Sequence, residues 1–301
     1  NIRNRMGLTT SRSLGVHATY DWKRVKLRSN IQYVGTDRLE DSRTTVDNYI
    51  RKDKSITRST NNSRTENNNL VANAFLEWKM DSVTTLIFRP QYRFSANDRE
   101  NKGFQEGWGN DVLLNEKVSS GSSHNSQYNV TMMLQLSRKL SQKGRNVALK
   151  VDYGTNSSSN DRKNLSTTHY FKNDREDSKN QKIEDDINGY NYRVQLVYVE
   201  PLLWMHHLQL RYSYQYKVNN SDRFVYDWNE DLGEFTPDYD ESASNQFENQ
   251  YSNHLLNLAV RTSRKKYNYN VGVDLEPQKS VSHSLLSCLL YTSPSPRDGA
   301  T

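Results

Sequence analysis

Residues 77–94 read EWKMDSVTTLIFRPQYRF, and this stretch decides the fold. Around the Asp81-Ser82 pair, apolar residues occupy every second position: Ala72, Ala74, Leu76 and Trp78 before it, and Leu86, Phe88, Tyr92 and Phe94 after it. Most positions between them are polar or charged. A period of two is that of a β-strand, whose successive side chains point to opposite faces of a sheet. The stretch therefore predicts a hairpin of two long strands with one apolar and one polar face.

The same unit recurs along the chain, as supersecondary structure and not as a repeated sequence word. Short turns are expected near residues 23, 81, 143, 203 and 264, each flanked by in-phase apolar runs of about ten residues. The polar stretches at about 37–69, 96–127, 156–190 and 217–253 are interpreted as long loops. The sequence thus predicts about ten strands, with short turns at one end of the sheet and long loops at the other. This arrangement is typical of an outer-membrane β-barrel.

Composition narrows the class of protein. The 301 residues have a mean hydropathy of −0.97, but they include 19 Tyr, 8 Phe and 5 Trp, which is unlike a disordered chain. No apolar run is long enough for a membrane-spanning helix, and this does not exclude barrel strands. The net charge of +6 comes from Lys and Arg interleaved with Asp and Glu, so we expect a solvated surface and no nucleic-acid partner.

A soluble β-sandwich or propeller is the alternative fold, but its strands are shorter than the runs seen here. Trp22, Trp78 and Trp204 lie beside short turns, as an aromatic girdle at a membrane interface would. Arg12 is ten residues from Trp22, or roughly 25 Å of depth in a tilted strand, which places it at the opposite interface. Arg138 is expected to snorkel at the near rim. We therefore predict an all-β, antiparallel, up-and-down transmembrane β-barrel, present as an incomplete fragment of about ten long strands.

The C-terminal segment differs from the rest. Residues 288–301 resemble the conceptual translation of a sequencing adapter, and they hold the only cysteine, Cys288. We therefore assign residues 1–287 to the partial barrel and 288–301 to a non-native tail. The chain begins within a strand-like pattern, without an initiator Met or signal peptide, so truncation is expected at that end as well.

Several hairpin segments resemble a known family: residues 77–90, 137–145, 198–202 and 275–278 are similar to TonB-dependent-receptor-like outer membrane proteins of Bacteroidetes type. The resemblance covers about residues 1–285. It implies a location in the Gram-negative outer membrane and a complete barrel of about 22 strands. It also implies an N-terminal carboxypeptidase-regulatory-like domain and a plug, through which a TonB-type energy coupler would act. Neither the plug nor the coupler-contacting segment is recognised in these residues, so energised transport by this polypeptide alone is in question.

Candidate site residues are few. Six cations share the polar parity and are predicted to face a lumen: Arg89, Arg93, Lys150, Arg193, Arg211 and Arg261. Asp227, Asn229, Asp231 and Asp238 have the spacing of a degraded calcium loop, for which a solvated outer loop is the simpler interpretation. His206 and His207 are adjacent on a strand and cannot chelate one metal together. The acidic run Glu184 to Asp186 is expected to be loop surface. No catalytic arrangement or cofactor motif is apparent, so no enzyme activity and no cofactor are predicted.

Function follows from fold and resemblance. The primary hypothesis is nutrient uptake across the outer membrane, with lipid around the barrel and a nutrient ligand in its polar interior. The alternative is a structural or surface-interaction barrel without transport, whose partner could be a surface lipoprotein. A soluble secreted β-sheet protein is the third hypothesis.

Overall fold

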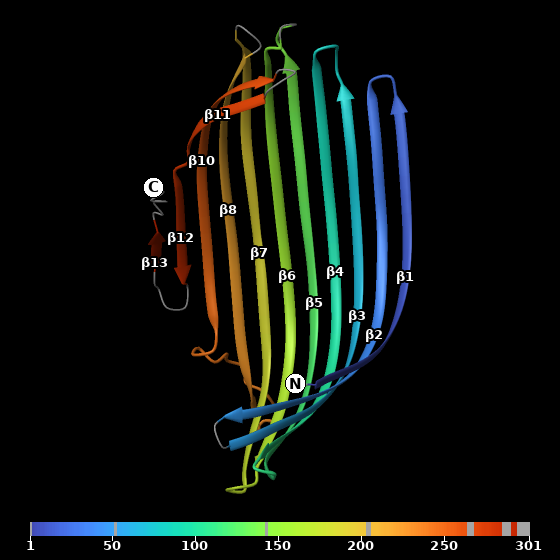
Figure 1. Ribbon diagram of the computed structural model, residues 1–301, viewed down its shortest axis with the longest axis vertical. Coiled ribbons are helices and arrows are strands. Elements are labelled where there is room, and N and C mark those ends of the chain that lie inside the picture. The colour runs from blue at the N-terminus through green and yellow to red at the C-terminus, as the bar shows by residue number, and fades with distance from the viewer. Residues whose placement is uncertain are drawn as a thin grey trace.

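The computed structural model describes residues 2–50, 53–141, 144–202, 206–263, 268–284 and 290–293. These residues form one open antiparallel sheet (Figure 1). The strands are β1 (Ile2–Trp22), β2 (Val25–Ile50), β3 (Asp53–Lys79), β4 (Thr84–Gly109), β5 (Val112–Lys139), β6 (Asn146–Tyr170), β7 (Arg175–Pro201), β8 (His206–Asn229), β9 (Glu234–Phe235), β10 (Asn245–Ser263), β11 (Asn268–Leu275), β12 (Gln278–Ser284) and β13 (Leu290–Ser293). The described residues contain no helix that is long and apolar enough to cross a membrane.

Each long strand pairs with its neighbour in the chain, in the order β1 to β8 and then β10. β11 and β12 both pair with β10, and their registers agree: Leu256 faces Leu275 and Asn253 faces Gln278. Between them the carbonyl of Pro277 accepts a hydrogen bond from the amide of His254 at 3.0 Å. Because proline has no donor for the ladder, one strand is divided in two at this point. β11 and β12 together are therefore the tenth strand, and the predicted ten-stranded up-and-down sheet is confirmed.

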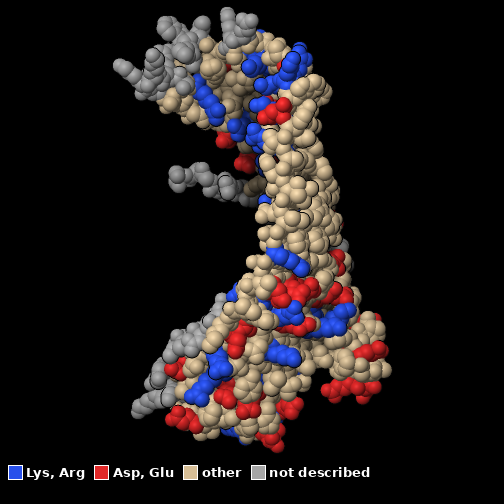
Figure 2. All heavy atoms as spheres, turned by 90° about the vertical axis from the view of Figure 1, so that its right-hand side faces the viewer, with Lys and Arg blue, Asp and Glu red and all other residues tan. Residues whose placement is uncertain are grey.

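The predicted parity also holds across the whole sheet. One hydrogen-bonded row crosses all ten strands: Trp22, Val25, Trp78, Leu86, Leu136, Leu149, Leu196, Tyr212, Leu256 and Leu275. Residues opposite each other in an antiparallel pair share a face, so this row defines the apolar face. Most of its side chains are exposed, as with Leu196 (45%) and Leu256 (42%), and Val25 and Leu86 are half-buried. Figure 2 shows the sheet hollowed on one side, with few charged atoms along the middle of the bulging side.

The interpretation of the polar stretches as loops is wrong for the first three. β2 and β3, β4 and β5, and β6 and β7 remain paired through them. The β4–β5 hairpin closes at Asn110 and Asp111, whose φ angles of 47° and 64° suit a two-residue turn. The ladder continues because peptide groups pair whatever the side chains, and Asn, Ser and Thr hydrogen-bond across it. Only the fourth stretch contains a long loop, at residues 230–244, which includes β9.

The hairpins are staggered in a regular way. Beyond the apolar row, β1 ends at once, β3 ends one residue later, and β5, β7 and β10 end three, five and seven residues later. Figure 1 shows the ends of the strands rising in steps from β1 to β7. Seven residues over eight strand spacings correspond to a strand tilt of about 30°. Closed barrels require a tilt of this kind, typically about 35–45°.

Strand length separates two zones of the sheet. β5 has 28 residues, so it is about 90 Å long. The in-phase apolar positions occupy only the half next to the short turns, and we call this zone the apolar belt. The other half, from about Ser95 to Gly109 on β4, projects about 50 Å beyond the belt. The turn residues 203–205 (with Trp204) and 264–267 and most of the predicted tail, including Cys288, lie outside the described residues.

Candidate functional site

The six predicted lumen cations lie on one face, opposite the apolar row, and we call it the polar face. One row contains Arg89, Met133, Asp152 and Arg193 on successive strands β4 to β7. Lys150 Nζ lies 3.0 Å from Asp152 Oδ2. Arg193 donates a hydrogen bond to Gln215 at 3.0 Å, and the Arg89 guanidinium lies 4.9 Å from the centre of the Phe75 ring. These three cations form a band across the belt.

The other three cations are elsewhere on the same face. Arg93 lies four residues beyond Arg89, toward the projecting half of β4. Arg261 donates to Asn270 at 3.2 Å, and Arg211 Nε is buried without a hydrogen-bond partner. The six residues are thus distributed from β4 to β10 and do not converge on one site. Their role in lining a lumen stays a prediction.

The calcium-like residues make turn contacts. Asn229 Oδ1 accepts hydrogen bonds from the amides of Asp231 and Leu232 at 2.9 and 3.2 Å, and Asp227 Oδ1 accepts one from Gln181 at 2.8 Å. The Asp238 carbonyl accepts one from the Thr236 hydroxyl at 2.9 Å. Within the described residues, no group of three or more His, Cys, Asp or Glu side chains is placed to hold a metal ion.

The two adjacent histidines face opposite ways, as predicted. His206 Nδ1 contacts the hydroxyls of Thr262 and Tyr269 on the apolar face, at 3.0 Å for Tyr269. His207 pairs with Arg261 on the polar face. Glu184 to Asp186, expected in a loop, lie within β7 instead. There Glu184 pairs with Lys182 at 2.5 Å and Asp185 contacts Arg162.

A recurring sequence word was missed by the sequence analysis. Asp-Arg occurs five times, and four of the five, at 37–38, 98–99, 161–162 and 222–223, recur at intervals of 61 to 63 residues. The fifth, at 174–175, lies where β7 begins and is outside this spacing. The four pairs lie on β2, β4, β6 and β8, the outgoing strands of four hairpins. The chain therefore repeats a word as well as a hairpin, and aligning the hairpins by their turns would have shown it.

Each of these four Asp-Arg pairs places its aspartate on the apolar face and its arginine on the polar face, because adjacent residues of a strand point to opposite faces. Asp37, Glu66, Asp98, His124, Asp161 and Glu184 form one continuous row on the apolar face beyond the belt. The next row toward the strand tips, on the same face, carries Arg64, which pairs with Asp37 at 2.8 Å and Glu66 at 2.6 Å. The arginine of each Asp-Arg pair points to the polar face instead. Figure 2 shows Lys and Arg atoms intermixed with Asp and Glu atoms in the lower part of the molecule, where the strands project beyond the belt. Both faces of the projecting half nevertheless carry charges of both signs. Arg64, Lys163 and Lys182 share one row of the apolar face, and Glu40 and Asp185 lie on the polar face.

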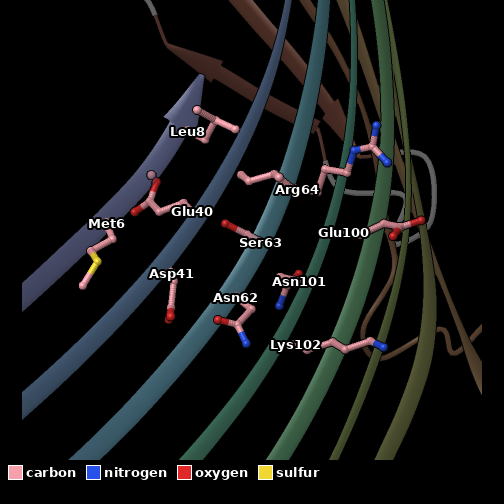
Figure 3. A pocket seen from close by; sticks show the side chains of 12 residues that line it. Met6, Leu8, Glu40, Asp41, Asn62, Ser63, Arg64, Glu100, Asn101 and Lys102 are labelled. Carbon is pink, nitrogen blue, oxygen red and sulfur yellow. The ribbon is translucent and has the colours of Figure 1, made fainter. Parts of the chain in front are cut away.

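Two of the clefts in the projecting half adjoin these charged residues. One, of about 360 Å³, is on the polar face between Arg38 and Arg99, with Thr65, Asn67 and Asn97 among its lining residues. The other, of about 560 Å³, brings Met6 and Leu8 of β1 beside Arg64 and Lys102 (Figure 3). Figure 3 shows the side chains of this second groove spread over four strands without converging on one point.

Aromatic residues border the apolar belt on both sides. Trp22 and Trp78 lie in the apolar row, within one residue of the short-turn end of their strands. Tyrosines lie on the same face seven to nine residues from the short-turn end of their strands: Tyr33, Tyr92, Tyr153, Tyr192 and Tyr214. The rings of Tyr192 and Tyr214 are 6.0 Å apart. At about 3.3 Å per residue and a 30° tilt, the two borders are roughly 25 Å apart.

Comparisons with known proteins give only distant similarity. No protein-family model and no curated protein matches the chain. The siderophore receptor PiuA from Acinetobacter baumannii is 10% identical with a TM-score of 0.35, over 98% of this chain and 65% of that one. The RagAB peptide importer is 7% identical with a TM-score of 0.26, over 94% and 53%. BauA, the ferric preacinetobactin receptor from Acinetobacter baumannii, is 7% identical with a TM-score of 0.24, over 97% and 59%. The chain spans about half to two thirds of these structures, and likeness at this level carries no functional argument.

Proposed function

We propose that this chain is a membrane-spanning section of an outer-membrane β-barrel receptor that takes up a nutrient. The observation that carries the proposal is the apolar belt, which crosses ten strands without a break and is bordered by Trp on one side and Tyr on the other. Its height of roughly 25 Å is that of the lipid-facing band of outer-membrane barrels. Lipid is the partner of this face.

The chemistry of the two faces supports a barrel wall more than a soluble sheet. A soluble protein rarely leaves an apolar patch of more than a few hundred Å² in water. Here large apolar side chains such as Leu134 (42% exposed) and Leu258 (49% exposed) are accessible across the whole belt. Within the same strands the opposite face carries Arg, Lys, Asn and Gln, which suit a hydrated passage. The strand tilt agrees with closure into a barrel together with further strands.

Depth-dependent fluorescence quenching tests the membrane assignment. The complete protein that contains this section is reconstituted in vesicles of brominated phosphatidylcholine, as single-tryptophan variants that keep Trp78 or Trp108. Trp78 borders the belt, whereas Trp108 lies at the far tip of β4 and serves as the matched control. We expect strong quenching of Trp78 and almost none of Trp108. Equal quenching of both would refute the assignment of the belt to lipid.

The transport part of the proposal concerns the whole protein. A TonB-type coupler would act through a plug domain, and the polar face would line the route of the ligand. A strain lacking the complete gene should grow poorly on at least one sole nutrient that the parent strain uses. Normal growth on every nutrient of a broad panel would exclude uptake as the function.

The projecting half of the sheet favours a second candidate, a surface-interaction barrel without transport. Paired strands that extend about 50 Å beyond the belt offer a rigid polar surface to a partner such as a surface lipoprotein. Co-purification of a lipoprotein with the intact protein, together with unchanged nutrient uptake in the deletion strain, would favour this candidate.

A further inference from the structure

The Asp-Arg word places four arginines at regular intervals on the polar face. Arg38, Thr65, Arg99, Ser123 and Arg162 are successive members of one hydrogen-bonded row on β2 to β6. Arg223 on β8 lies in the adjoining row, where it faces Asp185. Alternate strands are about 10 Å apart, so the Cα atoms of these arginines recur at about that interval. We call Arg38, Arg99, Arg162 and Arg223 the arginine row.

Carboxylates neutralise only part of the arginine row. Arg38 pairs with Glu40 at 2.6 Å. Arg162 and Arg223 share Asp185, and the Arg223 contact is long at 3.9 Å. Nε of Arg162 and Nε of Arg223 are buried without a hydrogen-bond partner. Arg99 is exposed and makes no ion pair within the described part of the chain. The four arginines thus have only two carboxylate partners between them, Glu40 and Asp185, and some of their N–H groups remain able to donate hydrogen bonds to an acidic ligand.

The groups between the arginines are neutral and hydrogen-bonding. Thr65 and Ser123 separate the arginines within the row, and Asn67, Asn97, Asn125 and Asn160 occupy the next row on the same face. No aromatic ring occupies either row from β2 to β6, so stacking of nucleobases has no platform there. Amides and hydroxyls between cations match a chain in which neutral, hydroxyl-rich units alternate with acidic ones.

We propose that the arginine row binds an acidic oligosaccharide that bears a carboxylate on every second sugar. Each guanidinium would donate two parallel hydrogen bonds to a carboxylate, the geometry in which arginine binds this group most strongly. The Asn and Ser/Thr side chains between them would bind the hydroxyls of the neutral sugars. Two sugar rings of an extended chain have about the reach of two strand spacings. This inference rests on the proposed function, because it names the class of nutrient that the polar face would admit.

The test uses the complete protein that contains this section, in phospholipid nanodiscs, with calorimetry at low salt. The probe is a hyaluronan octasaccharide, in which acidic and neutral sugars alternate, and the control is the same octasaccharide with its carboxylates methyl-esterified. We expect binding of the acid form, at least tenfold weaker binding of the ester, and an affinity that falls as NaCl is raised. Brominated-lipid quenching of Trp78 on the same sample reports insertion independently.

Variants locate the site. Arg99→Gln, which breaks no ion pair, should weaken binding about tenfold, since a charged hydrogen-bonded pair is lost. Arg43→Gln is the control: Arg43 is an exposed arginine of β2 in the same projecting half, but it lies on the opposite face, so the affinity should stay unchanged. A variant with all four arginines replaced by Gln should abolish binding, and Trp78 quenching shows that it still inserts.

Several results would overturn the proposal. Equal affinity for the acid and the ester would show that charge plays no role in binding. Equal losses of affinity in Arg99→Gln and Arg43→Gln would show that the arginine row is not the binding site. If a poly-glutamate peptide or single-stranded DNA bound more tightly than the octasaccharide, the ligand of the arginine row would be an acidic peptide or a nucleic acid and not an oligosaccharide. In the complete protein, insertion without octasaccharide binding refutes this inference alone, whereas failure of the belt to insert refutes the proposed function.

Discussion

Replacing Leu134 by arginine tests whether lipid covers the apolar belt. Leu134 lies on β5 in a row with Phe88 and Val151, and its side chain is 42% exposed. It is five residues from the end of the strand at Lys139, and two and four residues from Met132 and Val130, which pair with the border tyrosines Tyr153 and Tyr92; it is thus about 6–14 Å from either border of the belt. It is therefore close to the middle of the belt. Gln135, the next residue, points to the polar face and provides a matched site for the same substitution.

The expected cost differs sharply between environments. An arginine on the lipid face at the midplane costs about 2–4 kcal/mol, and near an interface about 0–1 kcal/mol. An arginine on an exposed position in water changes stability by less than about 0.5 kcal/mol. Leu134→Arg should thus lower the free energy of unfolding by about 2–4 kcal/mol, and Gln135→Arg should have almost no effect. Leu86→Arg, which pairs with Trp78 at the border, should cost about 1 kcal/mol or less.

Equilibrium unfolding by guanidinium chloride in phosphatidylcholine vesicles measures these differences, with tryptophan fluorescence and the heat-modifiable band on gels as independent signals. The order Leu134, Leu86, Gln135 from most to least destabilising is the signature of a depth gradient. If Leu134→Arg and Gln135→Arg shift the unfolding midpoint equally, the apolar face is not in contact with lipid, and the membrane proposal fails.

Three further predictions concern the sheet and its turns. Gly189→Ala should destabilise the fold by about 1–3 kcal/mol, because the added Cβ would lie 2.5 Å from the Val218 carbonyl oxygen. Gly15→Ala is the control: its added Cβ would lie 3.9 Å from the nearest atom, so this variant should keep its stability in the same unfolding assay. Asp81 Oδ1 accepts hydrogen bonds from the amides of Val83 and Thr84 at 2.7 and 2.6 Å, and these bonds lower the pKa of its carboxyl group. The ionised form of Asp81 therefore stabilises the fold above the unfolded pKa of about 3.9, and this stabilisation is lost as pH falls through the lower pKa of the folded state. The unfolding midpoints measured at pH 7 and pH 3 should differ less for Asp81→Asn than for the parent protein. Equal differences would argue against the turn hydrogen bonds. Asn110→Val should weaken the β4–β5 hairpin, because a β-branched residue is poorly tolerated at a φ of 47°, whereas Asn110→Gly should not, and hydrogen exchange at the tips of β4 and β5 would show the contrast.

Much of the fold was accessible from the sequence. The alternation around Asp81, repeated five times, was sufficient for the strand number, the pairing order and the assignment of residues such as Leu86 and Arg89 to opposite faces. These properties follow from a period of two and from short turns, both of which are local. Strand ends in the polar stretches were missed, because a hairpin can continue without apolar residues. The turn signals at Asn110-Asp111 and Asn173-Asp174 were present but were hidden within runs of similar polar residues.

The candidate site was only partly accessible. The face on which Arg89, Arg93 and Arg193 lie was predicted correctly. Their positions relative to one another depend on the register between strands, which the sequence of a single strand does not specify. The arginine row illustrates the same limit: Arg38, Arg99 and Arg162 are more than sixty residues apart in sequence, and only the pairing of five strands brings them into line.

The sequence by itself determined the alternation, the five hairpins and the sign of charge at each position, because strand geometry fixes the face of every second side chain. The tertiary structure decided how far the ladders extend, how the hairpins are staggered, and which residues of different hairpins share a row. The physical reason is that a β-sheet is assembled by hydrogen bonds between strands, and the register of those bonds is set by turns, tilt and neighbouring hairpins together.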